Sequence, residues 1–314
     1  MQLLISHARP PGPNCQAAIA HLSVPNLTEL LGLLTSNPPI LGAPEALTPL
    51  PERMRATHIG LQGTDGLIPW AAIDAQQLGL TKIHGDAGWA WITLCHLNMQ
   101  SNHILMDDPL ELGVSAQECE SLLSVMKRYF EEDGITLHPL TNATWLAFGE
   151  VFKNLATASL DRVAGSAIND WMPLQEDAKH LRRLQNEMQM LLYTHAVNDA
   201  RSELSQPAIN AFWISGTGTP QSSLVANTEP LECIDTLHRA ALRDDPHAWQ
   251  EAWKTLDRTH LADLVQRAKL AKPVKLSLCG PRMAVTLELQ NKPWWGRLQQ
   301  RFSMTSPQQL LNSL

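Results

Sequence analysis

Apolar residues recur every three or four positions in three long stretches of the chain, at about 115–134, 176–200 and 246–268. This spacing places them on one face of an amphipathic helix, so each stretch predicts a helix with one buried side. Ser115 suits the N-cap of the first helix, and Gly134 is typical of the position just beyond a helix end.

Shorter apolar segments predict further helices and the strands of a sheet. Helices are expected at 68–80 and in the leucine-rich stretch after Pro25, with Ser23 as the N-cap of the latter. Strands are expected at 2–6, in the two runs that flank the polar turn at 98–102, and at 135–149, 209–215 and 274–289. The last stretch contains a Gly-Pro turn and is typical of a hairpin.

The order of these elements indicates a mixed architecture. Between residues 88 and 150 a strand, a strand, a helix and a strand follow one another, which is typical of a compact α+β unit. The 314 residues can bury a substantial core, as one large domain or two ordinary ones.

Composition narrows the classes of function. The formal net charge of −7 argues against a nucleic-acid-binding or anionic-membrane-binding surface, since either needs a concentrated basic patch. No segment approaches the roughly 18 uncharged apolar residues of a membrane span. The first residues contain no basic leader, so we expect a cytoplasmic protein. Five scattered cysteines without CxxC spacing predict reduced, mostly buried thiols.

The stretch from Leu191 to Gly218 holds the most unusual polar residues. His195, Asn198 and Arg201 follow one another at helical spacing, so they can converge at the end of a helix, and Asn210 interrupts an apolar strand. An arginine with nearby amides and an imidazole suits a carboxylate or phosphate ligand. The same residues suit a helix end anchored to a strand, and the sequence leaves both interpretations open.

Other polar clusters give weaker signals. The glycines of "SGTGTP" at 215–220 fit neither a dinucleotide-binding loop nor a P-loop, so a tight loop is expected there. Asp107 and Asp108 near His103, and His84 near Asp86, could hold a metal ion, although strand-end turns are commoner. No Ser-His-Asp order or GxSxG motif identifies a nucleophile.

The chain resembles cofactor-independent phosphoglycerate mutases of the alkaline phosphatase superfamily in two stretches. These are "SVPNLTELLGLL", similar to "TPNLDxLAxxG", and "THAVNDARSELSQPAINAFWISGTG", similar to "HPVNxxRxxxGxxPANxxxxxGxG" with Ala196 in place of proline. Together with "LATASLDRVAG" and "LRRLQNEMQMLLYTH", they most closely resemble the RpfE-type regulatory protein family of proteobacteria.

The resemblance implies an α/β fold with an alkaline-phosphatase-like core sheet flanked by helices. The core would comprise residues 1–84 and 156–314, and an inserted α+β subdomain would comprise 85–155. It also implies a candidate anion pocket, because His195, Asn198, Arg201 and Asn210 match motif positions, and Asp161 and Arg162 lie where the mutases contact an anion.

The departures from this family concern its metal centre. The family's first strand is followed by a metal-binding aspartate, but here 2–6 is followed by "HARPPGPN", which has no carboxylate. The C-terminal hairpin at 274–289 has neither His nor Asp where further ligands are expected. The resemblance therefore implies no catalytic residue, no bound metal and no cofactor.

We therefore expect a non-catalytic protein with a regulatory role, whose partner is a small phosphorylated or carboxylated metabolite or a regulatory protein. The alternative is an active metal-dependent phosphoryl-transfer enzyme with a metal site rebuilt from other residues. Such a site would draw on His84, Asp86, His103 and Asp108. A third interpretation is an interaction module with an exposed Trp surface at 292–298, a segment for which a packed C-terminal helix is the commoner outcome.

Overall fold

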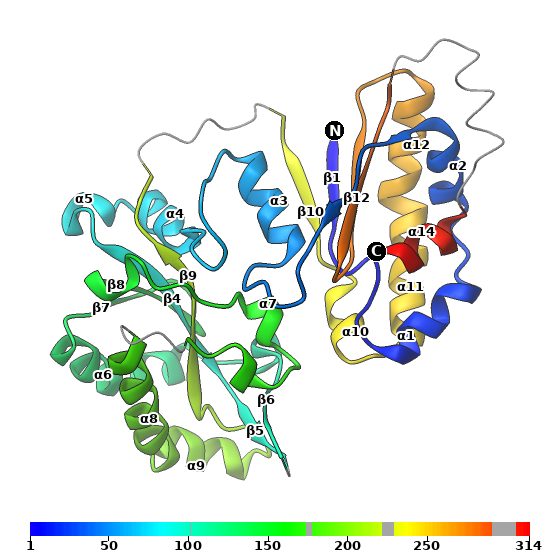
Figure 1. Ribbon diagram of the computed structural model, residues 1–314. Helices are drawn as coiled ribbons and strands as arrows, with labels where there is room; N and C mark the ends of the chain where they lie inside the picture. The colour runs from blue at the N-terminus through cyan, green and yellow to red at the C-terminus, as the bar shows by residue number, and fades with distance from the viewer. Residues whose placement is uncertain (101, 174–177, 222–228, 291–305) are drawn as a thin grey trace. The chain divides into compact units, whose positions relative to one another are not determined.

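The computed structural model describes residues 1–100, 102–173, 178–221, 229–290 and 306–314. Its helices and strands form two compact units, each with its own sheet (Figure 1). The first unit comprises Met1–Glu45, Pro49–Ile59 and Ala226–Leu314, and the second comprises Ala46–Thr48 and Gly60–Val225. The segment 292–298, with its expected Trp surface or helix, lies outside the described residues.

The sheet of the first unit is mixed. Its strand order is β10 (Leu231–Ile234), β1 (Gln2–Ile5), β11 (Lys275–Cys279), β12 (Met283–Glu288) and β2 (Thr35–Ser36), and β3 (Ile40–Leu41) also pairs with β12. Strand β1 runs parallel to both β10 and β11, whereas β11 and β12 form the expected antiparallel hairpin. The carboxyl ends of β10, β1 and β11 therefore meet at one edge.

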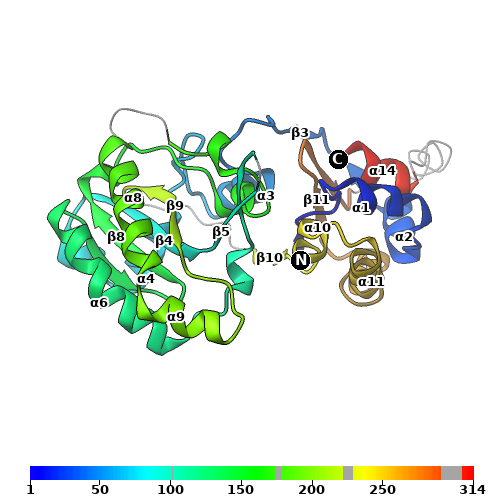
Figure 2. The same ribbon diagram turned by 90° about the horizontal axis from the view of Figure 1, so that it is seen from below.

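Helices cover both faces of this sheet. In the views of Figure 1 and Figure 2, α2 (Pro25–Leu33), α11 (Pro246–Leu256) and α14 (Pro307–Ser313) lie on the same side of β11. With α12 (Ala262–Lys269) they bury Leu3, Ile5, Leu276 and Leu278. Helix α3 (Leu50–His58) covers the opposite face through Leu50 and Met54. The described residues of this unit also form the helices α1 (Pro13–Ala18), η1 (Ile19–His21) and α10 (His238–Leu242).

The helix expected at 246–268 is confirmed, but it contains a π-helical turn, η6 (Asp257–Leu261), between α11 and α12. Asp257 in this turn is 1% exposed and accepts hydrogen bonds from the backbone N–H groups of Asn26 and Leu27, at 3.1 and 2.9 Å. Ser23 was expected to cap α2, but Val24 occupies the N-cap position. The cap of α2 comes instead from Asp257.

The sheet of the second unit is antiparallel, in the order β7 (Thr136–Pro139), β8 (Thr144–Gly149), β4 (Gly88–Cys95) and β9 (Ala211–Gly218). Strands β5 (Leu97–Met99) and β6 (Ile104–Met106) form a separate hairpin. This unit is larger than the insertion expected at 85–155. Its limits differ because β9 pairs with β4, and because helices from 70–77 and 179–193 cover the same sheet.

Two of its helices, α6 (Ala116–Glu132) and α8 (Lys179–Tyr193), cover one face of this sheet. Helix α4 (Trp70–Gln77) covers the other face, packed on Trp89 and Leu146. The expected N-cap of α6 is confirmed, since Ser115 and Glu118 form a reciprocal capping box. The described residues of this unit also form the helices α5 (Thr81–His84), η2 (Pro109–Glu111), η3 (Glu150–Phe152), α7 (Leu160–Val163), η4 (Ile168–Asp170) and α9 (Ala196–Glu203).

The single helix expected at 176–200 is wrong, because α8 ends at Tyr193 and α9 begins at Ala196. His195 between them has an extended backbone and is the N-cap of α9, where its Nδ1 accepts a hydrogen bond from the Val197 N–H at 3.2 Å. In the sequence, His195 has the spacing of the apolar residues of α8. In the structure, its side chain instead accepts a hydrogen bond from a backbone N–H in the first turn of α9.

The α/β fold class is confirmed by the sheets and their covering helices. The cysteines are free, and four of the five are buried. Burial raises the pKa of the Cys15 and Cys279 thiols to about 12, so both are protonated near neutral pH. Among the described residues, no helix is long and apolar enough to cross a membrane.

Candidate functional site

Asn198 joins the end of α8 to the start of β9. Its Nδ2 donates to the carbonyl oxygens of Leu192 and Ile209, at 2.8 and 2.9 Å, and its Oδ1 accepts from the Ile209 N–H at 2.8 Å. Both ends of the amide are therefore used between the two elements. This confirms the interpretation of the stretch as a junction between a helix and a strand.

Arg201 is 1% exposed and makes hydrogen bonds from three of its nitrogens. Its Nε donates to the Pro207 carbonyl at 2.7 Å, its Nη1 to Glu118 Oε1 at 2.8 Å, and its Nη2 to the Leu112 carbonyl. Burial acts to raise the pKa of Glu118, but hydrogen bonds from Ser115 and Arg201 outweigh it and hold this pKa below its usual value. Arg201 thus anchors α9 to the N-terminus of α6.

The side chain of Asn210 hydrogen-bonds to the backbone of Leu97, which begins β5 just after the end of β4. Its Oδ1 accepts from the Leu97 N–H at 2.7 Å, and its Nδ2 donates to the Leu97 carbonyl at 2.9 Å. Its own N–H donates to the Cys95 carbonyl at 3.2 Å. His195, Asn198, Arg201 and Asn210 are close along the chain, but they hydrogen-bond to different backbone segments.

Asp161 and Arg162, the other members of the predicted pocket, lie on the one-turn helix α7. Asp161 is exposed. The guanidinium of Arg162 lies 5.8 Å from the centre of the Trp171 ring, within the range of a cation–π contact. The structure therefore gives Arg162 an aromatic neighbour in its own segment. An anion at these residues stays a prediction.

The glycine-bracketed sequence expected to form a tight loop is the end of strand β9 as far as Gly218. A Cβ on Gly216 would lie 2.7 Å from the Trp91 ring, so this glycine permits a close approach between strand and indole. Thr217 is fully buried, and its hydroxyl lies within hydrogen-bond distance of two carbonyl oxygens, at 2.6 Å from Leu155 and 3.1 Å from Gly66. Packing and hydrogen bonds within the protein therefore account for the glycines and threonine of this stretch, and a bound phosphate is not needed to explain them.

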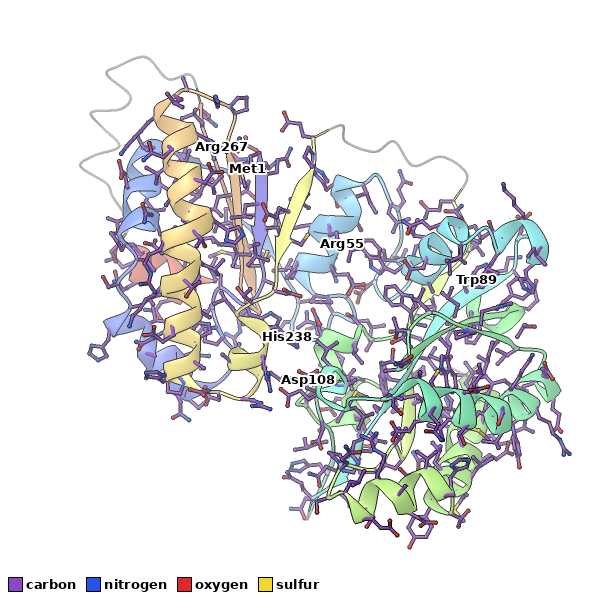
Figure 3. The ribbon with its side chains drawn as sticks, turned by 180° about the vertical axis from the view of Figure 1, so that it is seen from behind. Met1, Arg55, Trp89, Asp108, His238 and Arg267 are labelled. Carbon is purple, nitrogen blue, oxygen red and sulfur yellow. The ribbon has the colours of Figure 1, made fainter. Side chains whose placement is uncertain are left out.

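Basic side chains that the sequence did not single out lie at the carboxyl edge of the parallel strands of the first unit. His7 follows β1, and His238 begins α10 after β10 (His238 in Figure 3). The two imidazole rings are in contact, with their centres 4.7 Å apart. His7 has a φ of 54°, a left-handed conformation that costs a residue with a side chain about 1–3 kcal/mol.

Arg9 lies on the same loop. Its Nη2 donates to Gln16 Oε1 at 3.2 Å, and its buried Nε has no hydrogen-bond partner among the described residues. The nearby acid Asp244 accepts from the backbone N–H groups of Asn14 and Cys15. Ligands of open α/β sheets bind at the carboxyl ends of the parallel strands. The sequence could not show that these side chains lie at one edge, because the position of β1 between β10 and β11 is not visible in it.

The second unit contains a pair of histidines from distant segments. His84 of α5 and His138 of β7 have their Nε2 atoms 2.8 Å apart. Both rings contact Trp89, at centre distances of 5.7 and 6.2 Å (Trp89 in Figure 3). The buried Nε1 of Trp89 has no hydrogen-bond partner among the described residues, which costs about 1–3 kcal/mol if no acceptor reaches it.

The metal site of the alternative hypothesis is not assembled from the residues that the sequence suggested. His84 is paired with His138, while Asp108 caps η2 by accepting from the Leu110 N–H at 3.0 Å. Asp107 lies 3.9 Å from His96. Within the described part of the chain, no group of three or more His, Cys, Asp or Glu side chains is placed to hold a metal ion.

The chain is similar to two solved structures at low sequence identity. No family model and no curated protein matches it, so membership of the RpfE-type family stays a prediction. The cofactor-independent phosphoglycerate mutase from Thermoplasma acidophilum DSM 1728 is 13% identical, with a TM-score of 0.37, over 93% of this chain and 91% of that one. The PH0037 protein from Pyrococcus horikoshii is 12% identical, also with a TM-score of 0.37, over 91% and 87%.

Proposed function

We propose that this chain is a non-catalytic regulatory protein that binds a phosphorylated or carboxylated small molecule at the carboxyl edge of β1 and β10. The observation that carries the proposal is the set of basic side chains at this edge. His7 and Arg9 follow β1, which lies between the two other parallel strands. His238, which begins α10 after β10, contacts the His7 ring.

The chemistry of these side chains favours an anion over a metal ion. A hydrolytic two-metal centre needs several carboxylates to hold its ions. Here an imidazole and a guanidinium follow β1, and the nearby carboxylate of Asp244 is already used by the N–H groups of α1. Arginine binds carboxylate and phosphate groups through its planar set of donors, and the buried Nε of Arg9 has no hydrogen-bond partner among the described residues.

The backbone of His7 supports the same site. Strained left-handed residues persist where the surrounding structure fixes them, and they cluster at ligand sites. The Ala8 N–H donates to the Cys279 carbonyl at 2.9 Å, and the Ser6 N–H donates to the Ile234 carbonyl at 3.0 Å, so β11 and β10 hold the loop on both sides. A ligand would therefore meet a preformed loop.

Calorimetric titration with inorganic phosphate, 3-phosphoglycerate and citrate tests the proposal. We expect one of these anions to bind the wild-type chain, Arg9→Gln to weaken binding about tenfold or more, and Arg9→Lys to retain part of it. Arg267→Gln is the matched control, because Arg267 is exposed on α12 and pairs with Asp263 at 2.7 Å (Arg267 in Figure 3).

The same samples decide between binding and catalysis. They are incubated with an aryl phosphate and with 3-phosphoglycerate in the presence of Mn²⁺ or Zn²⁺. Metal-dependent turnover that Arg9→Gln leaves intact would overturn the proposal in favour of the enzyme. Equal binding by wild type and Arg9→Gln would place the anion elsewhere and reject this site.

A further inference from the structure

The histidine pair of the second unit joins an element that is otherwise weakly held. Helix α5 has four residues, none of them buried, and it lies between Gly79 and Gly85, which both have positive φ. The side chain of His84 fixes its end, with ring centres 4.6 Å from Phe148, 5.7 Å from Trp89 and 4.9 Å from His138. The position of α5 therefore depends on what holds the His84 ring.

The two imidazoles face each other through the atoms that bind metal ions. The Nε2 atoms are 2.8 Å apart while the ring centres are 4.9 Å apart, so the nitrogens lie between the rings. Two nitrogens on one tetrahedral Zn²⁺, each about 2.0–2.1 Å from the ion, lie about 3.3 Å apart. A small rotation of either half-buried ring provides that separation.

We propose that His84 and His138 bind a divalent transition-metal ion, of the class of Zn²⁺ or Cu²⁺, which fixes α5 to the edge strand β7. Water completes the coordination, since both side chains are only half-buried.

The charges around the pair are compatible with this ion. Imidazole binds a metal ion in its neutral form. Burial, the neighbouring His84 and the ammonium of Lys127 all lower the pKa of His138. Lys127 lies 3.7 Å from Glu131, and this exposed carboxylate offsets its charge. We expect binding to be moderate in affinity and to weaken in acid.

The test is a titration of the chelator-treated full-length chain with ZnCl₂ at neutral pH. We expect one Zn²⁺ per chain and, at about ten times the dissociation constant, a thermal midpoint raised by about 3–5 °C. His84→Gln and His138→Gln should each weaken binding by at least about tenfold, since even outer-shell partners change metal affinity by about 10–100-fold. His180→Gln, which removes an exposed histidine of α8, is the control and should bind as the wild type does.

Two measurements on the wild-type chain make the result independent of how the variants fold. Paramagnetic resonance of the Cu²⁺ form should show two nitrogen donors, and Zn²⁺ should slow amide hydrogen exchange within 81–86. The proposal is overturned if the wild type binds no Zn²⁺, if His180→Gln loses binding as His138→Gln does, or if the Cu²⁺ form shows fewer than two nitrogens.

Discussion

At the scale of single residues, Arg201 shows how a side chain with a binding-site signature can serve the fold. Its guanidinium is buried and donates to Glu118 and to the carbonyls of Pro207 and Leu112. Replacing it by methionine would leave a carboxylate and two carbonyls without their donor. We expect Arg201→Met to lower the free energy of unfolding by about 3–5 kcal/mol, as when one member of a buried ion pair is removed. Chemical denaturation followed by circular dichroism measures this loss.

The matched control for Arg201 is Arg128→Met, since Arg128 on α6 is 82% exposed and its pair with Glu132 contributes little.

The pH dependence of the stability loss separates the contribution of the ion pair from that of packing. The lowered pKa of Glu118 stabilises the fold above the pKa of the unfolded chain, and this contribution disappears as pH falls through the folded-state pKa. The difference between wild type and Arg201→Met should therefore narrow in acid; a difference that is constant with pH would contradict the ion pair.

At the scale of elements, the structure separates what local spacing can predict from what tertiary contacts decide. The apolar period correctly predicted α6, the hairpin of β11 and β12, and the long helix of α11 and α12. It failed at His195, because a histidine at the right spacing for the stripe of α8 can equally cap a new helix. The hydrogen-bonded junction at Asn198 was one of two interpretations, and the carbonyl acceptors that decide between them are not visible in sequence.

The cap of α2 is a second case of a tertiary contact, and it gives a prediction. Asp257 accepts from the N–H groups of Asn26 and Leu27, which are 231 and 230 residues away along the chain. Asp257→Ala would leave the buried N–H of Leu27 and the part-buried N–H of Asn26 without this acceptor. We expect a loss of about 2–4 kcal/mol, which combines the cap with the cost of unpaired donors. Thermal unfolding checks it, with Asp263→Ala on the exposed face of α12 as a control that should change the midpoint little.

At the scale of the whole molecule, the two units have separate cores. Trp249 and Trp253 pack with Leu3 and Leu276 in the first, whereas Phe130 packs in a different cluster in the second. This division could not be predicted from the order of elements, because β9 joins β4 across more than a hundred residues of chain. Units with separate cores unfold as separate cooperative transitions when contacts between them contribute little to stability.

We therefore expect calorimetry of the wild-type chain to resolve two unfolding transitions, each assigned by one variant. Asp257→Ala should lower the midpoint of one transition only, and Arg201→Met should lower the other by about 10 °C, since a unit of this size shifts by about 2–4 °C per kcal/mol. If Zn²⁺ binds the histidine pair, it should raise the same transition that Arg201→Met lowers, because both sites lie in the second unit. A single transition lowered by both variants would mean that the two cores unfold together, and ligand binding in one unit would then stabilise the other by linkage.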